Sequence, residues 1–96
     1  MNIPKQIKIG GHTVDVDIVS LRDTEKDHGS FDSVYMVIRL TEGRPESRMA
    51  ETLLHEIFEA IKHLNNLSLE HKDLTVLSEG LFSVIRNNNL RFDLGE

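Results

Sequence analysis

The spacing of apolar residues changes once, about halfway along the chain, and this change restricts the fold more than any other feature. Over residues 6–19, apolar and polar residues alternate on both sides of Gly10 and Gly11, which predicts a β-hairpin. Residues 34–40 are rich in β-branched and aromatic side chains and predict a third strand. The polar residues 21–30 predict a loop between them. The first half therefore predicts a short three-stranded sheet of antiparallel type.

In the second half, apolar residues recur every three or four positions, which is the period of an amphipathic helix. The pattern predicts one helix over residues 45–64 and a second from about residue 71 to about residue 86, followed by a short tail over residues 90–96. Strands followed by helices predict an α+β fold, here a single domain over residues 1–96. The predicted apolar stripes of the two packed helices consist of Leu53, Leu54, Ile57, Phe58, Ile61 and Leu64, and of Leu74, Leu77, Leu81, Val84 and Ile85.

Charge and composition exclude several classes of function. The net charge is −5 with histidine neutral and the basic residues are scattered, so no nucleic-acid partner is expected. No apolar run approaches the roughly 20 residues of a membrane-spanning helix, and the N-terminus lacks a signal-peptide pattern. The absence of cysteine excludes thiolate metal sites and fits a cytoplasmic location. Because the predicted core uses the apolar stripes, we expect a monomer or dimer.

The first predicted helix carries the motif His55-Glu56-x-x-Glu59 on its polar side. Each residue of an ideal helix turns about 100°, so His55 and Glu59 project about 40° apart, with Glu56 about 60° further round. In the zinc motif His-Glu-x-x-His, the outer residues hold Zn²⁺ and the inner glutamate deprotonates a metal-bound water. A carboxylate in the second position is also an accepted zinc ligand. A solvated polar face, which amphipathic helices commonly have, explains the same spacing equally well.

A zinc site needs a third ligand, and three residues are candidates. His63 lies one turn beyond Glu59, but ligands at three successive turns spread over about 12 Å, too far for one tetrahedral ion. Glu79 follows Glu59 by 20 residues, but it points about 160° away from the apolar stripe of the second helix, toward solvent. His71 lies about 80° from that stripe, on its flank, and can face the first helix. We therefore favour His71 and keep Glu79 in reserve, while an ordinary first-turn histidine remains the alternative.

Residues 52–61, with the sequence TLLHEIFEAI, are similar to the active helix of small zincin-like metallopeptidase domains, many of them encoded by phages, prophages and bacteria. In that family a short N-terminal sheet precedes a Thr-Leu-Leu-His-Glu helix. A further helix begins with a Leu-x-His-x-x-Leu pattern, which residues 69–74 match. Residues 29–32 resemble the family's turn into its edge strand. The resemblance covers residues 29–88 and is specific at the Leu-Leu-His-Glu core.

The resemblance implies a minimal zincin-like fold with His55 as the first metal ligand and Glu56 as the general base. It implies a zinc-dependent hydrolase, a metallopeptidase that uses water activated by Zn²⁺ or another divalent metal against a peptide or protein substrate. The strand over residues 34–40, if it is an edge strand, would align an extended peptide. Glu59 stands where many members have a second histidine, and a carboxylate acidifies the bound water less. This departure leaves open a non-catalytic zincin-like binding module, for example a phage protein that acts on a host factor.

Overall fold

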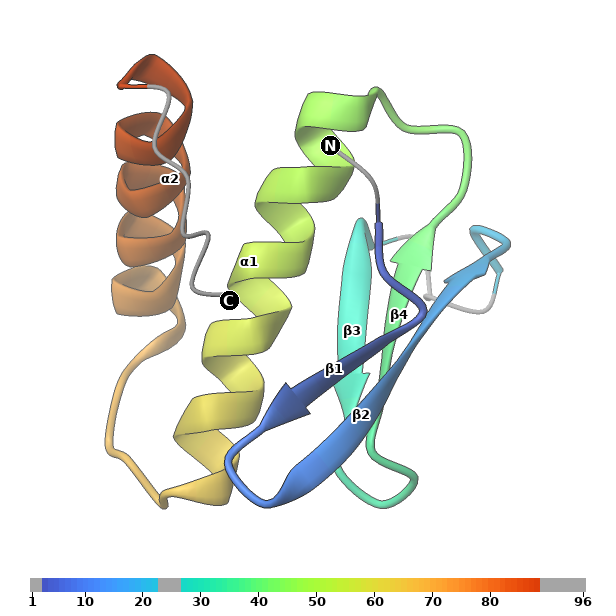
Figure 1. The fold of residues 1–96 in the computed structure, drawn as a ribbon, viewed down its shortest axis with the longest axis vertical. Helices are drawn as coiled ribbons and strands as arrows, with labels where there is room; N and C mark the ends of the chain where they lie inside the picture. The colour runs from blue at the N-terminus through green and yellow to red at the C-terminus, as the bar shows by residue number, and fades with distance from the viewer. Residues whose placement is uncertain (1–2, 23–26, 89–96) are drawn as a thin grey trace, which may run out of the picture.

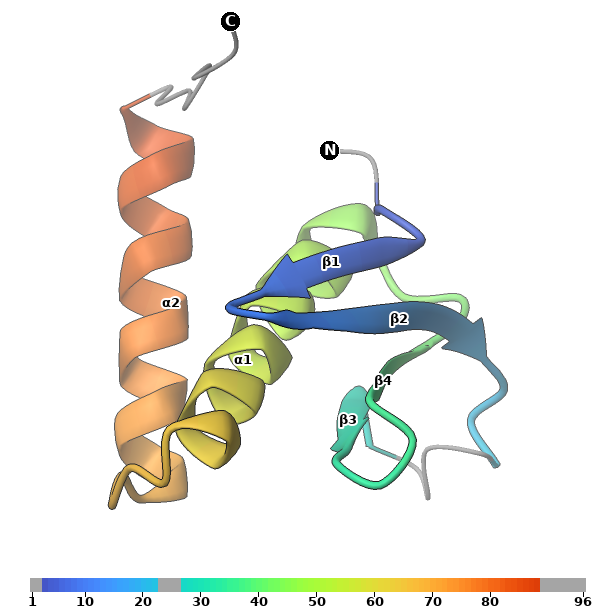
Figure 2. The ribbon, with the colours of Figure 1, turned by 60° about the horizontal axis from the view of Figure 1, so that its bottom comes forward.

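The protein has an α+β fold in which a β-sheet is followed by two helices, as the sequence predicts. The structure, a computed structural model, describes residues 3–22 and 27–88. Residues 23–26 of the predicted loop and the predicted tail, residues 90–96, lie outside the described residues. Helix α1 lies between the sheet and α2 (Figure 1, Figure 2). In chain order the elements are β1 (Gln6–Ile9), β2 (His12–Val19), β3 (Gly29–Asp32), β4 (Val37–Thr41), α1 (Glu46–Leu64) and α2 (His71–Asn87).

Four strands form one mixed sheet, so the predicted three-stranded antiparallel sheet is wrong in strand number and in one pairing. The strand order is β1-β2-β4-β3. Antiparallel pairs join β1 to β2 and β3 to β4, whereas β2 and β4 are parallel, with Val16 opposite Ile38. After β2 the chain forms β3 at the edge and returns as β4 between β3 and β2 (Figure 1). Local sequence does not indicate this pairing, because no tight turn joins parallel neighbours.

The strand that the sequence prediction missed, β3, begins within the last two residues of the predicted loop and continues to Asp32. Conversely, β4 begins at Val37, because Val34 and Tyr35 lie in the turn between β3 and β4. The Asp32 carboxylate accepts hydrogen bonds from the backbone N–H groups of Val34 and Tyr35, at 2.9 and 3.1 Å. An aspartate that binds the backbone two or three residues ahead favours a turn. This local bonding outweighs the β propensity of the two residues.

The hydrophobic core lies between the sheet and α1. Its buried members come from β2, β4 and α1, namely Val14, Val16, Ile38, Leu40 and Leu53. Burial of such branched side chains contributes about 1.5–3 kcal/mol each and fixes which side of α1 faces the sheet. Because α2 packs on another side of α1, polar residues of α1 are also enclosed, and Glu56 is buried.

Helix α2 packs against α1 through a face that differs from the predicted apolar stripe. Leu74 is fully buried as expected, but Leu77, Leu81 and Val84 are each at least 39% exposed, and Ser78 is buried instead. Leu74 and Ser78 are one turn apart and mark the seam with α1. This seam lies toward the flank of α2 that carries His71, so the helix is rotated relative to the prediction. Neither α1 nor α2 has the length and apolarity to cross a membrane.

Candidate metal centre

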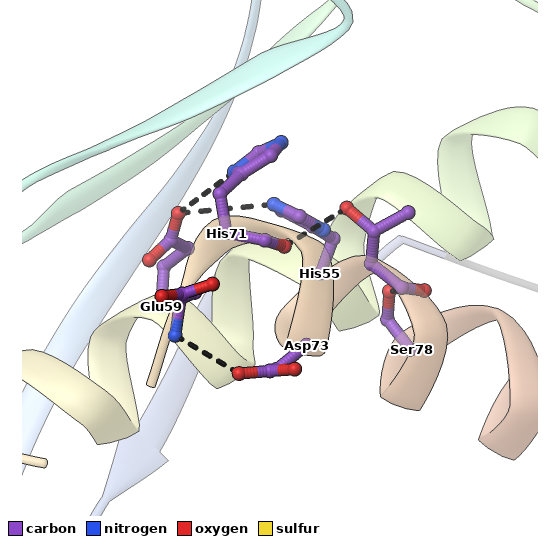
Figure 3. A network of polar contacts seen from close by, with 7 residues as sticks. His55, Glu59, His71, Asp73 and Ser78 are labelled. Atoms are coloured by element: carbon purple, nitrogen blue, oxygen red, sulfur yellow. Dashed lines mark hydrogen bonds and ion pairs between the residues drawn. The ribbon is translucent and has the colours of Figure 1, made fainter. Parts of the chain in front are cut away.

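Helix α1 presents His55 and Glu59 one turn apart, where they point toward the start of α2 (Figure 3). His55 Nε2 lies 3.8 Å from Glu59 Oε2, and the two side chains are only 15% and 29% exposed. Leu53 and Ala60 are buried on the opposite side of the helix, which fixes the direction in which His55 and Glu59 project. Both residues therefore lie in an enclosed position, and a freely solvated polar face does not describe them.

His71, the first residue of α2, reaches the same place from the other helix (Figure 3). The helix starts there because the Asp73 carboxylate accepts a hydrogen bond from the backbone N–H of Glu70 at 3.2 Å, part of a capping box. His71 Nδ1 lies 3.7 Å from Glu59 Oε2. The rings of His55 and His71 have their centroids 5.0 Å apart. The structure thus brings together the three side chains that the sequence nominated as ligands.

The spacing of the three ligand atoms suits a single metal ion. One nitrogen of each of His55 and His71 and one oxygen of Glu59 all lie within 4.8 Å of one another. The separations of 3.7 and 3.8 Å to Glu59 are too long for hydrogen bonds. Tetrahedral Zn²⁺, with bonds of about 2.0–2.1 Å, needs ligand atoms about 3.3 Å apart, so small side-chain rotations complete the geometry. Two imidazoles and a carboxylate are also donors that Zn²⁺ accepts, and the residues present therefore fit zinc.

The surroundings of His55 favour its neutral form. Burial is the largest cause that lowers its pKa, and the charge of His71 lowers it further. The carboxylates of Glu59 and Glu79 act in the opposite direction but do not reverse the shift. A neutral imidazole is the form that binds a metal ion, so the lowered pKa reduces the competition from protons.

Glu56 lies beside the cluster and is only 7% exposed. Burial raises its pKa to about 7, and the neighbouring charges of Glu59 and Asp27 add to the effect. A carboxyl group with a pKa near neutrality can both accept and release a proton during a reaction. Its side chain lines the pocket beside His55 and also a second pocket beside Phe31.

The pocket beside the cluster has a volume of about 380 Å³ and lies between α1, α2 and the start of β3. Strand β3 approaches α1 closely at Gly29. A Cβ atom at this position would lie 2.8 Å from Thr52 Cγ2 and 2.9 Å from the backbone oxygen of Arg39. Since Thr52 precedes His55 by one helical turn, this close packing sets the edge strand next to the candidate metal centre.

His28, His63 and the reserve ligand Glu79 lie near the cluster but outside it. Among the described residues, the only set with ligand spacing is the one above, so Glu79 is not part of it. Glu79 is exposed yet lines the pocket, because α2 is rotated from its predicted orientation. His63 is exposed, and its ring meets Phe31 edge-on at 6.1 Å in the second pocket. His28 lines the first pocket without having been predicted to do so, and its place just before the missed strand β3 explains why.

Comparisons of the chain with family models, with curated proteins and with solved structures give no match. The zincin-like resemblance therefore depends on the motifs in residues 29–32, 52–61 and 69–74. Because one fold serves many functions, the function has to be argued from the chemistry of the site.

Proposed function

We propose that the protein is a zinc-dependent hydrolase of the metallopeptidase type, with His55, Glu59 and His71 as the metal ligands. The observation that carries this proposal is the convergence of one ligand atom from each residue to within 4.8 Å. Glu56, the residue that follows the first ligand, has a pKa near 7 and lines the same pocket. Ligands and base thus stand side by side, as a metal-assisted hydrolysis requires.

In this hydrolysis the metal ion and Glu56 have separate roles. When bound, Zn²⁺ supplies Lewis acidity, which acidifies a water molecule and polarises the carbonyl of the substrate. Glu56 accepts a proton from the attacking water and passes it to the nitrogen of the leaving amine, so that the same carboxyl acts first as base and then as acid. The low exposure of His55 and Glu56 keeps this proton transfer away from bulk water.

A peptide substrate suits the edge of the sheet beside the pocket. The sequence leaves open whether the strand over residues 34–40 is an edge strand; β4 lies inside the sheet, and β3 forms the edge on this side. An edge strand carries backbone N–H and C=O groups that point outward and can pair with an extended chain. A peptide added to β3 would run beside Gly29, which lines the pocket next to His55.

Metal content and hydrolysis test the proposal separately. Zinc in purified protein is measured by mass spectrometry for the wild type and for His55→Ala, Glu59→Ala and His71→Ala, with Glu79→Gln as the matched control. We expect near-stoichiometric zinc in the wild type and in the control, and little in the three ligand variants. Zinc that is absent from the wild type, or that survives in all three ligand variants, contradicts the proposed centre.

Hydrolysis is followed with casein that carries self-quenching fluorophores. The wild type loaded with zinc should release fluorescence, and Glu56→Gln should abolish release while it retains the metal. Zinc binding without any Glu56-dependent hydrolysis would favour the non-catalytic binding module instead.

A further inference from the structure

A further pocket, distinct from the one beside Phe31, adjoins the metal pocket and has a basic lining. It has a volume of about 430 Å³ and lies where the N-terminus of α1 meets the last turns of α2. Arg44, Arg48 and Arg86 line it, together with Phe82 from α2. The basic pocket and the metal pocket are adjacent, because His28, Arg48 and Glu51 line both.

The positive charge of this pocket is only partly compensated. Arg48 forms an ion pair with Glu51 at 3.3 Å, and both side chains are partly exposed, which makes the pair weak. Among the described residues, no carboxylate pairs with Arg44 or Arg86. The chain as a whole has a net charge of −5, whereas this pocket has an excess of positive guanidinium groups. Such a local positive charge favours an anionic ligand.

The side chains of Arg44 and Arg86 each have a feature that bears on binding, although Arg86 is exposed. The Nε atom of Arg44 is buried and has no hydrogen-bond partner, a state that costs free energy unless a ligand supplies an acceptor. The guanidinium of Arg86 lies over the ring of Phe82, 5.9 Å from its centroid, which restricts its orientation. Helix α1 begins at Glu46, and its N-cap residue Pro45 provides no side-chain cap, so the backbone N–H groups of Ser47 and Arg48 add donors at the same place.

The distance between this basic pocket and the metal ligands fits a peptide. Arg48 precedes His55 by seven residues, and at a rise of 1.5 Å per residue the two are about 10 Å apart along α1. An extended chain covers about 3.3 Å per residue, so this distance corresponds to about three residues of substrate.

We propose that the basic pocket formed by Arg44, Arg48 and Arg86 is a subsite for a carboxylate of the substrate, about three residues from the bond that is cleaved. The role of the pocket as a substrate subsite rests on the proposed peptidase function. Its ability to bind a carboxylate does not. The carboxylate is either the C-terminal group of a peptide or the side chain of an acidic residue. Guanidinium groups suit both, because their paired N–H donors match the two carboxylate oxygens.

Three small probes separate the two sources, and the zinc-free protein is used so that the metal cannot bind them. They are N-acetylglutamine, which has only the α-carboxylate; N-acetylglutamate α-amide, which has only the side-chain carboxylate; and N-acetylglutamine amide, which has neither. Each is titrated into the full chain while nuclear magnetic resonance follows the backbone amides of Ser47 and Arg48 and the arginine Nε–H signals. We expect at least one charged probe to shift these signals and to saturate, and the neutral probe to leave them unchanged.

Arg44→Gln and Arg86→Gln should each weaken binding of the charged probe at least about tenfold, since each removes a charge-assisted hydrogen bond. Lys8→Gln, which removes one charge from the exposed part of β1, should have no such effect. If a variant fails to fold, the wild type is titrated at low and high sodium chloride, where high salt should weaken binding. Equal shifts with the neutral probe, no saturable shift with either charged probe, or unchanged affinity in the arginine variants would overturn the subsite. Because no zinc is present, failure of the metal centre leaves this result unaffected.

Discussion

Replacement of Glu56 by glutamine should make the zinc-free protein more stable at neutral and alkaline pH. In the folded protein the carboxyl is buried, and this burial raises its pKa from 4.5 to about 7. A raised folded-state pKa means that folding favours the protonated form. The contribution of the Glu56 carboxyl to the free energy of unfolding is therefore fully present below pH 4.5, and it is lost as the pH rises through 7. Glutamine keeps the shape of the protonated acid and does not ionise, so its contribution stays constant.

The size of the effect follows from the pKa shift. A rise from 4.5 to about 7, at 1.36 kcal/mol per unit, corresponds to about 3 kcal/mol. We expect wild type and Glu56→Gln to have equal free energies of unfolding near pH 4, and the variant to be more stable by up to about 3 kcal/mol at pH 8. For a domain whose total stability is about 5–15 kcal/mol, this difference is easy to measure.

Urea unfolding followed by circular dichroism, in the presence of a chelator, gives the free energy of unfolding at each pH from 4 to 8. Glu42→Gln serves as the control, because Glu42 is exposed in the turn between β4 and α1, and its curve should run parallel to that of the wild type. Parallel curves for Glu56→Gln and the wild type over the whole range would refute the argument, since they would mean that Glu56 is not destabilised by burial.

Two further predictions concern the metal and the packing of β3. Zinc at 100 times its dissociation constant should stabilise the wild type by about 2.7 kcal/mol. Removal of that zinc by a chelator should then lower the melting temperature by about 10 °C or more in a calorimeter, whereas His71→Ala should show almost no change. Gly29→Ala should cost about 1–3 kcal/mol in urea unfolding, because its Cβ would meet a side chain and a backbone oxygen at under 3.0 Å. Gly11→Ala, whose Cβ would meet nothing within 4 Å, is the control, and an equal cost at both positions would contradict the packing argument.

The two helices and the relative positions of the α1 residues were predictable because helical geometry is local. The backbone hydrogen bonds of a helix join residues four apart, so sequence spacing fixes which side chains share a face. His55, Glu56 and Glu59 therefore lie side by side as their spacing predicts. Leu53 points away from His55 and Glu59 into the core for the same reason.

The orientation of α2 was predicted only in part. The apolar stripe placed His71 on a flank that can reach α1, and His71 does approach Glu59. The same stripe also placed Leu77 and Leu81 in the core, where the fold leaves them exposed, and it gave no sign that Ser78 would be buried. A helix that packs against a single neighbour needs only a narrow contact face. A small residue such as Ser78 lets two helices approach closely. The apolar pattern therefore did not identify the face of α2 that contacts α1.

By itself, the sequence determined the α+β order of elements and both helices, and it favoured His55, Glu59 and His71 as candidate metal ligands with Glu79 in reserve. Only the tertiary structure decided that β3 forms at the sheet edge beside the pocket, that β2 and β4 pair in parallel, and that His71 lies 3.7 Å from Glu59. The reason is the range of the interactions. Helical periodicity and turn bonding act between residues a few positions apart, whereas strand pairing and helix packing join distant segments whose contacts depend on the whole core.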